Sequence, residues 1–321
     1  MSQGYIYQPK QLNISKPSDE VIIPKNDISK EKYFIWHIQG GMGKNIAGTS
    51  LVKSIKETYP DRKLIMVTSW PEVYLNNMDV DRVYQLSQTP YFYEDYIEGN
   101  DVIISKHEPY HQTDHITKKK HLIHNWCDLM CLEYTSQIPV IIPNYPQGML
   151  LGLWKRNKPI MVIQTSGGPM DGQKYSYSWT RDIPIEIAQQ IVKKYQNDYH
   201  IIQITRTDGY PLDGVERMDS KMSNMELFSL MVASEKRVLI DSSLQHAAAA
   251  LNKKSTVLWV GTSPKVFGYN LHTNIEAKLP QRANQLIGSY TFDYQFENNI
   301  HECPYMNVKD IFDINEIFRL I

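Results

Sequence analysis

The amino-acid sequence predicts an α/β protein built of two successive halves, each with a parallel β-sheet. Short apolar runs alternate with segments of helical spacing along most of the 321 residues, and this alternation is typical of β-α-β units. The alternation stops over residues 139–159, which contain four prolines, and then starts again. A stretch of this kind favours a connection between two domains.

Three strands and two helices are predicted in the first half. The strands cover residues 33–38, 63–67 and 101–105, which are apolar and rich in β-branched or aromatic side chains. The helices cover residues 46–59 and 121–132, where the apolar residues have helical spacing. This order predicts a parallel sheet with crossover helices.

The second half repeats the pattern with four strands and three helices. The predicted strands are residues 160–164, 201–205, 238–241 and 255–260. The predicted helices are residues 185–195, 225–233 and 244–251. Pro184 precedes the first of them, and proline is favoured in the first turn of a helix. Two Rossmann-like units are the simplest architecture for this order.

We divide the chain accordingly into four parts. An irregular N-terminal arm precedes an N-terminal Rossmann-like domain, a C-terminal Rossmann-like domain and a C-terminal segment that we expect to pack back toward the N-terminal domain. Their predicted bounds are residues 1–31, 32–150, 151–290 and 291–321.

The composition is that of a globular protein in a reducing compartment. Hydrophobic residues make up 42% and charged residues 21%, and the formal net charge of −1 gives the whole molecule no bias toward nucleic acid or membrane. Three cysteines form no disulfide framework, so we expect a cytoplasmic protein. No continuous apolar stretch approaches the ~18 residues of a membrane helix.

A glycine-rich turn, "HIQGGMGKNIAG", connects the first strand to the first helix. Gly40, Gly41 and Gly43 would let the backbone approach a ligand, and the following helix N-terminus favours an anion. The turn is neither a P-loop nor the dinucleotide fingerprint, because Asn45 and Ile46 stand where those motifs need other residues. A tight turn without a ligand remains the alternative.

The second candidate site is "LIDSSLQHAAAAL". A predicted strand ends at Asp241, Ser242 or Ser243 is a suitable N-cap for the next helix, and His246 lies one turn inside it. Ligands of open α/β sheets bind at the carboxyl ends of the strands, so this segment suits a phosphate and a sugar ring. The alternative is a simple cap with a core histidine.

Two further segments follow predicted strands. In residues 164–184, Thr165 and Ser166 could bind phosphate oxygens, and Lys174 or Arg181 could neutralise their charge. Residues 105–124 hold five of the ten histidines; His107, His111 and His115 are four apart, as on one helix face, but Pro109 argues against a regular helix and hence against a metal site. The run 118–120 is basic, and a solvated face is its commoner explanation.

In this order, the segments resemble the heptosyltransferase family of lipopolysaccharide assembly, glycosyltransferase family 9. "GGMGKNIAGTSLVKSIKETYPDRKL" resembles the family's glycine turn and first helix, and "DSSLQHAAAAL" resembles closely its strand end, hydroxyl residues and histidine before alanines. "RDIP", "SNMELFSLMVAS", "STVLWVGTSP" and "ECPYMNVKDI" resemble further family segments in the same order. The resemblance covers the chain from about residue 33 to its end.

The resemblance implies a GT-B fold, with two Rossmann-like domains facing a central cleft. The N-terminal domain would bind the acceptor beside Gly40, Gly41 and Gly43, and the C-terminal domain the nucleotide-sugar. Donor contacts would carry over to Asp241, Ser242, Ser243 and His246, with Arg181 facing the diphosphate and Thr262 near the nucleotide. No cofactor or metal is implied, because the nucleotide-sugar is a co-substrate.

One departure concerns the general base. The family's glycine turn usually ends Gly-Asp, and that Asp is the proposed base, whereas this chain has Lys44. A lysine with an ordinary pKa of ~10.4 is charged at neutral pH and cannot take a proton. Glu108 and His107, directly after the third predicted strand, are the candidate replacements; Asp101, at the start of that strand, is a weaker one.

These observations predict a glycosyltransferase, inverting and metal-independent, that moves a hexosyl, heptosyl or pentosyl group from a nucleotide-diphosphate-sugar to a saccharide hydroxyl. Two alternatives stay open: transfer to hydroxylated bases of DNA, as in phage DNA modification, and a non-catalytic nucleotide-sugar binder that lost its base at Lys44. An oxidoreductase is disfavoured because neither glycine fingerprint fits. Peripheral contact with a membrane is compatible with all of these readings.

Overall fold

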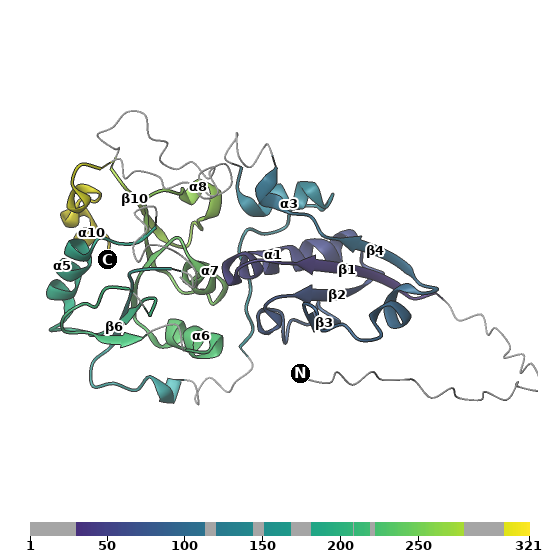
Figure 1. Ribbon diagram of the computed structural model, residues 1–321, viewed down its shortest axis with the longest axis horizontal. Helices are drawn as coiled ribbons and strands as arrows, with labels where there is room; N and C mark the ends of the chain where they lie inside the picture. Colours follow the sequence, from purple (N-terminus) through teal and green to yellow (C-terminus); the bar gives the residue numbers. More distant parts are fainter. Residues whose placement is uncertain are drawn as a thin grey trace, which may run out of the picture.

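The computed structural model describes residues 30–112, 120–143, 151–167, 181–207, 209–218, 222–278 and 305–321. Lys174, His115 and residues 118–119 of the basic run lie outside these residues. Lys120, the last residue of that run, forms an ion pair with Asp128. Two α/β domains lie side by side, one coloured purple to blue and the other mostly green in Figure 1. The two successive halves predicted from the sequence are therefore confirmed.

The N-terminal domain contains a four-stranded parallel sheet. Its strands are β1 (Lys32–Ile38), β2 (Lys63–Thr68), β3 (Arg82–Gln85) and β4 (Asp101–Ser105), in the order β3-β2-β1-β4. The central strand β1 pairs Phe34 with Leu64 of β2 and with Ile103 of β4. Successive side chains of a strand point to opposite faces, so Phe34 and Trp36 face one core while Tyr33 and Ile35 face another.

Helices cover one face of this sheet and an aromatic segment covers the other. The helical elements are α1 (Met42–Thr58), η1 (Pro71–Val73), η3 (Pro109–His111) and α3 (Leu122–Leu129), together with η2 (Tyr93–Ile97), which belongs to the aromatic segment. Trp36 meets Trp126 of α3 edge to face, with ring centroids 5.2 Å apart. On the opposite face, Tyr84, Phe92 and Tyr96 pack over β1 and β2.

The C-terminal domain contains a six-stranded parallel sheet with the Rossmann strand order. The strands are β5 (Ile160–Gln164), β6 (His200–Ile204), β7 (Glu216–Met218), β8 (Lys236–Ile240), β9 (Thr256–Trp259) and β10 (Thr273–Glu276), in the order β10-β9-β8-β5-β6-β7. Numbered within the domain, this order is 6-5-4-1-2-3, with a topological switch between β5 and β8.

The helices of this domain are α5 (Ile185–Tyr195), α6 (Asn224–Ala233), α7 (Ser243–Ala250), α8 (Pro264–Phe267), η4 (Val308–Asp310) and α10 (Ile314–Leu320). Ser223 begins α6 with a capping box, because its hydroxyl accepts from the backbone of Glu226 while the Glu226 carboxylate accepts from the backbone of Ser223. The Ala-rich α7 packs close to the sheet, with Ala247 and Ala248 fully buried.

The predicted segments agree with the observed ones to within a few residues, and three short strands were missed. β3, β7 and β10 have only three or four residues and no run of apolar side chains, so the spacing of apolar residues does not predict them. α1 begins at Met42, four residues before the prediction. Its first turn is polar, and the Asn45 side chain holds it by donating to the Gly41 carbonyl at 3.1 Å.

The described part of the C-terminal segment, residues 305–321, packs on the C-terminal domain. α10 lies against α5, and Ile311 and Ile317 are buried in the same core as Ile187. Their apolar side chains complete this core, which corrects the packing toward the N-terminal domain that we expected from the sequence.

The two domains meet where α1 contacts α7, in the middle of the molecule (Figure 1). A Cβ atom placed on Gly43 would lie 3.0 Å from the His246 ring and 3.2 Å from the Ser243 Cα atom, so only glycine fits without a shift. Hydrogen bonds flank this contact. The His121 ring and the Gln137 amide bond to the Gly268 carbonyl at 3.0 and 3.1 Å.

We predict that Gly43→Ala lowers the free energy of unfolding by about 1–3 kcal/mol, the usual cost of overpacking. The matched control is Gly41→Ala, because a Cβ atom on Gly41 would meet nothing within 4 Å and its φ of −68° suits any residue. Denaturant titration of both variants measures the difference. Equal stability of the two variants would contradict the close contact between α1 and α7.

Candidate functional site

A cleft of about 670 Å³ lies between the two domains. Its walls are built by the segments that follow β1 and β4 on one side and β5 and β8 on the other. In each sheet these two strands are neighbours. In the C-terminal sheet the chain connections of β5 and β8 also leave in opposite directions, so a crevice opens beyond their carboxyl ends. The cleft therefore joins the switch point of the C-terminal sheet to the carboxyl ends of β1 and β4.

The cleft brings together most of the residues that the sequence singles out. The N-terminal domain contributes Gly40, Gly41, Gly43, Lys44 and Glu108, and the C-terminal domain contributes Ser166, Arg181, Asp241, Ser242, Ser243 and His246. His107, Thr165 and Thr262 do not line it.

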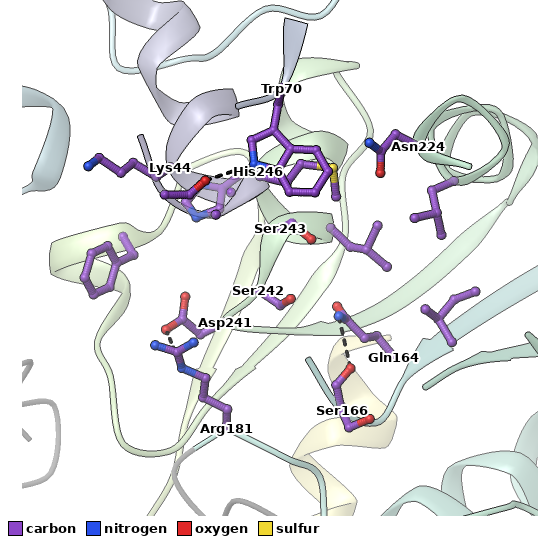
Figure 2. A pocket seen from close by; sticks show the side chains of 18 of the residues that line it. Lys44, Trp70, Gln164, Ser166, Arg181, Asn224, Asp241, Ser242, Ser243 and His246 are labelled. Atoms are coloured by element: carbon purple, nitrogen blue, oxygen red, sulfur yellow. Dashed lines mark hydrogen bonds and ion pairs between the residues drawn. The ribbon is translucent and has the colours of Figure 1, made fainter. Parts of the chain in front are cut away.

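The N-terminus of α7 opens into the cleft. Ser242 is the N-cap residue, with φ −159° and ψ 177°, but its hydroxyl makes no capping hydrogen bond. The first N–H groups of a helix have no partner within the helix and carry a partial positive charge. Figure 2 shows Ser242 and Ser243 between Arg181 and Trp70 along this opening. Backbone N–H groups and two hydroxyls can thus bind an anion here.

Asp241 stands directly before this helix and interacts with two residues. The Arg181 Nε atom lies 3.8 Å from Asp241 Oδ2, and the Thr262 hydroxyl donates to the same carboxylate oxygen at 2.7 Å. The Arg181 side chain is 38% exposed, whereas that of Asp241 is 9% exposed. Thr262 therefore orients the Asp241 carboxylate from outside the cleft, while Arg181 reaches into the cleft.

His246 is buried at the contact between the domains. Its Nδ1 atom lies 2.7 Å from the Tyr269 hydroxyl, and its Nε2 atom lies 3.0 Å from the Gln245 amide nitrogen. Since that amide nitrogen can only donate, Nε2 accepts and Nδ1–H donates to Tyr269. Burial, helped by repulsion from nearby His121, lowers the pKa of His246 to about 3. His246 is therefore a neutral group at pH 7.

On the opposite wall, Lys44 in the first turn of α1 forms an ion pair with Glu108. The Lys44 side chain is 7% exposed and that of Glu108 is 37% exposed. The ammonium also lies 5.4 Å from the Tyr110 ring centroid and 5.7 Å from that of Trp126, distances typical of cation–π contacts.

The turn before α1 is held by its own backbone geometry. Gly40 has φ +99°, a conformation that other residues rarely adopt. Its carbonyl accepts a hydrogen bond from the Trp70 indole N–H at 2.9 Å. This bond fixes the Trp70 ring at the edge of the cleft (Figure 2).

Two of the predicted site residues have other partners. The Thr165 side chain is buried, and its hydroxyl accepts from the Gln203 amide at 2.8 Å. His107 is exposed, and its ring lies 3.1 Å from the Ser105 hydroxyl. These positions correct the expectations that Thr165 contacts the donor directly and that His107 faces the cleft.

Sequence reasoning missed several residues of the cleft, notably Trp70, Arg206 and Asn224. Arg206 is buried and forms an ion pair with Asp182 at 2.9 Å. Trp70 stands two residues after the end of β2, and Arg206 stands two residues after the end of β6. The rule that residues following parallel strands line a ligand site would have identified both.

Among the described residues, no three His, Cys, Asp or Glu side chains gather as metal ligands would. Within the same part of the chain, no helix combines the length and apolar character needed to cross a bilayer.

No protein-family model and no curated protein matches this sequence. Solved structures do match its fold. A family 9 glycosyl transferase from Veillonella parvula has 11% identity and a TM-score of 0.64, over 91% of this chain and 96% of that chain. The E. coli ADP-heptose lps heptosyltransferase II has 12% identity and a TM-score of 0.54, over 77% and 91% of the two chains.

A third similar structure is TibC, described as a dodecameric iron-containing heptosyltransferase in complex with ADP-D-beta-D-heptose. It has 12% identity and a TM-score of 0.60, over 90% of this chain and 74% of that chain. The class defined by these matches is the GT-B fold of two Rossmann-like domains. Within that class, the chain has the fold of glycosyltransferase family 9, which confirms at the level of fold the resemblance seen in the sequence.

The lowered pKa of His246 predicts a pH dependence of stability. The pKa of His246 is ~6.5 in the unfolded chain and about 3 in the folded protein. At a pH between these two values the unfolded chain binds the proton and the folded protein does not. The free energy of unfolding therefore falls as the pH falls through this range. We expect wild type to lose about 2 kcal/mol more than His246→Gln between pH 7 and pH 5. Urea titration at both pH values measures this.

The control for this experiment is His107→Gln, because His107 is exposed. That variant should follow the wild-type pH dependence. A His246→Gln protein with the wild-type pH dependence would show that His246 is not held neutral in the folded state.

Proposed function

We propose that this protein is a glycosyltransferase that moves a sugar from a nucleotide-diphosphate-sugar to an acceptor hydroxyl. The observation that carries the proposal is the uncapped N-terminus of α7, which opens into the cleft beside the Arg181–Asp241 pair at the switch point of the C-terminal sheet. A diphosphate needs N–H donors and a cation, and a sugar needs a carboxylate acceptor; this corner of the cleft has all three.

Each group at this corner has a role in donor binding. The α7 N–H groups, with Ser242 and Ser243, bind the diphosphate, and Arg181 pairs with its charge. Asp241, oriented by Thr262 at 2.7 Å, accepts hydrogen bonds from hydroxyls of the donor. Ser166 lines the same wall, and Lys174 remains a proposed contact to the phosphates.

The reaction proposed is an inverting displacement. The acceptor oxygen attacks the anomeric carbon from the face opposite the nucleoside diphosphate, and the transition state resembles an oxocarbenium ion. Charge on the leaving diphosphate is stabilised by Arg181 and by the α7 dipole, the fixed donors that such a transition state requires. We therefore propose a metal-independent transfer.

A saccharide is the acceptor that suits the opposite wall best. The Trp70 ring is held at the cleft edge by its bond to Gly40, and an aromatic ring can pack on the apolar face of a sugar. Lys44 and Glu108 supply polar groups beside it. The similar structures named above include heptosyltransferases that use ADP-heptose, so ADP-heptose is the first donor to test.

We predict that Arg181→Ala weakens nucleoside diphosphate binding by about 10- to 100-fold, because a charge-assisted hydrogen bond to a phosphate contributes ~1.5–3 kcal/mol. Calorimetric titration with ADP, UDP, GDP and CDP measures the affinity. Arg319→Ala is the matched control, because Arg319 is exposed on α10. Equal affinities of both variants would contradict the assignment of Arg181.

Mass spectrometry of donor and acceptor mixtures then separates an enzyme from a binding protein. Transfer or donor hydrolysis above background identifies an enzyme. Tight nucleotide binding with neither reaction would instead favour the non-catalytic alternative.

A further inference from the structure

The ion pair of Lys44 and Glu108 joins two segments of the N-terminal wall of the cleft. Lys44 belongs to the first turn of α1, and Glu108 follows β4 by three residues. β1 and β4 are neighbours in the sheet, so the segments that follow them end side by side. The two side chains meet directly at the entrance to α1.

A buried ammonium at this place needs a carboxylate partner. The N-terminus of a helix carries a partial positive charge, so a lysine in the first turn is repelled by its own helix. α1 has no acidic residue in its first turn, and the Lys44 side chain is only 7% exposed. Glu108 supplies the missing negative charge, and the faces of Tyr110 and Trp126 add cation–π attraction.

The Glu108 carboxylate remains accessible while it is held. Oε2 pairs with Lys44, and among the described residues Oε1 accepts a single long hydrogen bond, 3.4 Å, from the Tyr110 backbone. The side chain is 37% exposed and lines the cleft. One carboxylate oxygen is thus available to an incoming hydroxyl.

We infer that Glu108 is the general base of the transfer and that Lys44 is its positioning residue. The inference rests on the proposed function. As the acceptor oxygen bonds to the anomeric carbon, its proton moves to the Glu108 carboxylate. The bond from that carbon to the diphosphate oxygen breaks, and its electron pair leaves with the nucleoside diphosphate. Glu108 then releases the proton to water.

Other candidate bases of the cleft region fit less well. His107 is exposed outside the cleft. His246 is buried with both ring nitrogens in hydrogen bonds. Asp241 is bonded to Thr262 on the donor side. Asp101 lies at the start of β4, where it pairs with Arg62.

The ion pair of Lys44 and Glu108 also explains how the chain can have Lys44 where the family has an aspartate. The sequence resemblance places an aspartate base at this position of α1. Lys44 instead draws a carboxylate from the end of β4 to the same helix terminus. A carboxylate thus lies at the α1 N-terminus although its residue belongs to another element.

The test compares Glu108→Gln and Lys44→Met in the full-length protein. Glu108→Gln keeps the size of the side chain but cannot accept a proton as a base, so we expect kcat to fall about 100- to 10,000-fold with nucleoside diphosphate affinity within twofold of wild type. Lys44→Met should lower kcat about 10-fold and move the acidic limb of the pH–rate profile to higher pH, and Lys44→Arg should restore much of the rate.

The matched controls are Lys56→Met and Glu57→Gln on the last turn of α1, where Lys56 pairs with Asp81 at 3.5 Å away from the cleft. Both should keep the wild-type kcat. Rates are measured with the best acceptor from the mass-spectrometric screen and, in parallel, with water as the acceptor.

The outcomes separate this inference from the proposed function. A wild-type kcat in Glu108→Gln, with normal ADP binding, would overturn Glu108 as the base and leave the donor site standing. An unmoved acidic limb in Lys44→Met would overturn the role of Lys44. A wild-type protein that binds no nucleoside diphosphate would overturn the proposed function, and the base with it.

Discussion

The contact between the N-termini of α1 and α7 is the constraint on which the cleft depends. It exists because Gly43 has no side chain; a Cβ atom there would lie 3.2 Å from the Ser243 Cα atom. The approach brings the positive ends of two helix dipoles to one place. Such an arrangement is unfavourable unless negative charge is placed at both ends. Glu108 provides this charge at α1, and in our proposal the diphosphate of the donor provides it at α7.

The surrounding side chains follow from the same electrostatic requirement. Arg181 and Lys44 add two cations to this small volume, so a third would be costly. His246 lies between the helices, and burial lowers its pKa to about 3, so that it stays neutral. Asp241 pairs with Arg181 at 3.8 Å. Lys44 and Glu108 therefore offset each other on the acceptor side, and Arg181 and Asp241 do so on the donor side, next to the N-terminus of α7.

The sequence predicted what periodicity and strand ends encode. Helix α5 and strand β5 were located to the residue, and Asp241, Ser242 and Ser243 were placed at the cleft because they follow a buried strand. β3 and β7 were missed, since three or four polar or mixed residues form strands only through pairing with distant neighbours. Side-chain pairing between segments that are distant along the chain leaves no pattern in the sequence either. Spacing along the chain does not show that Lys44 meets Glu108 64 residues later.

The identity to proteins of the same fold is only 11–12%. The two walls of the cleft explain how the same fold can tolerate such different sequences. In our proposal the donor wall acts mainly through backbone N–H groups of α7, which any sequence that forms the helix will present. The base must be a side chain, and a side chain can be supplied from any segment that reaches the same point. β1 and β4 are neighbours, so a carboxylate after β4 can replace one in α1 without a change of fold. Phosphate binding by backbone N–H groups thus keeps its position in the fold when the sequence changes. The base, which is a single side chain, can instead be supplied by the segment after the adjacent strand.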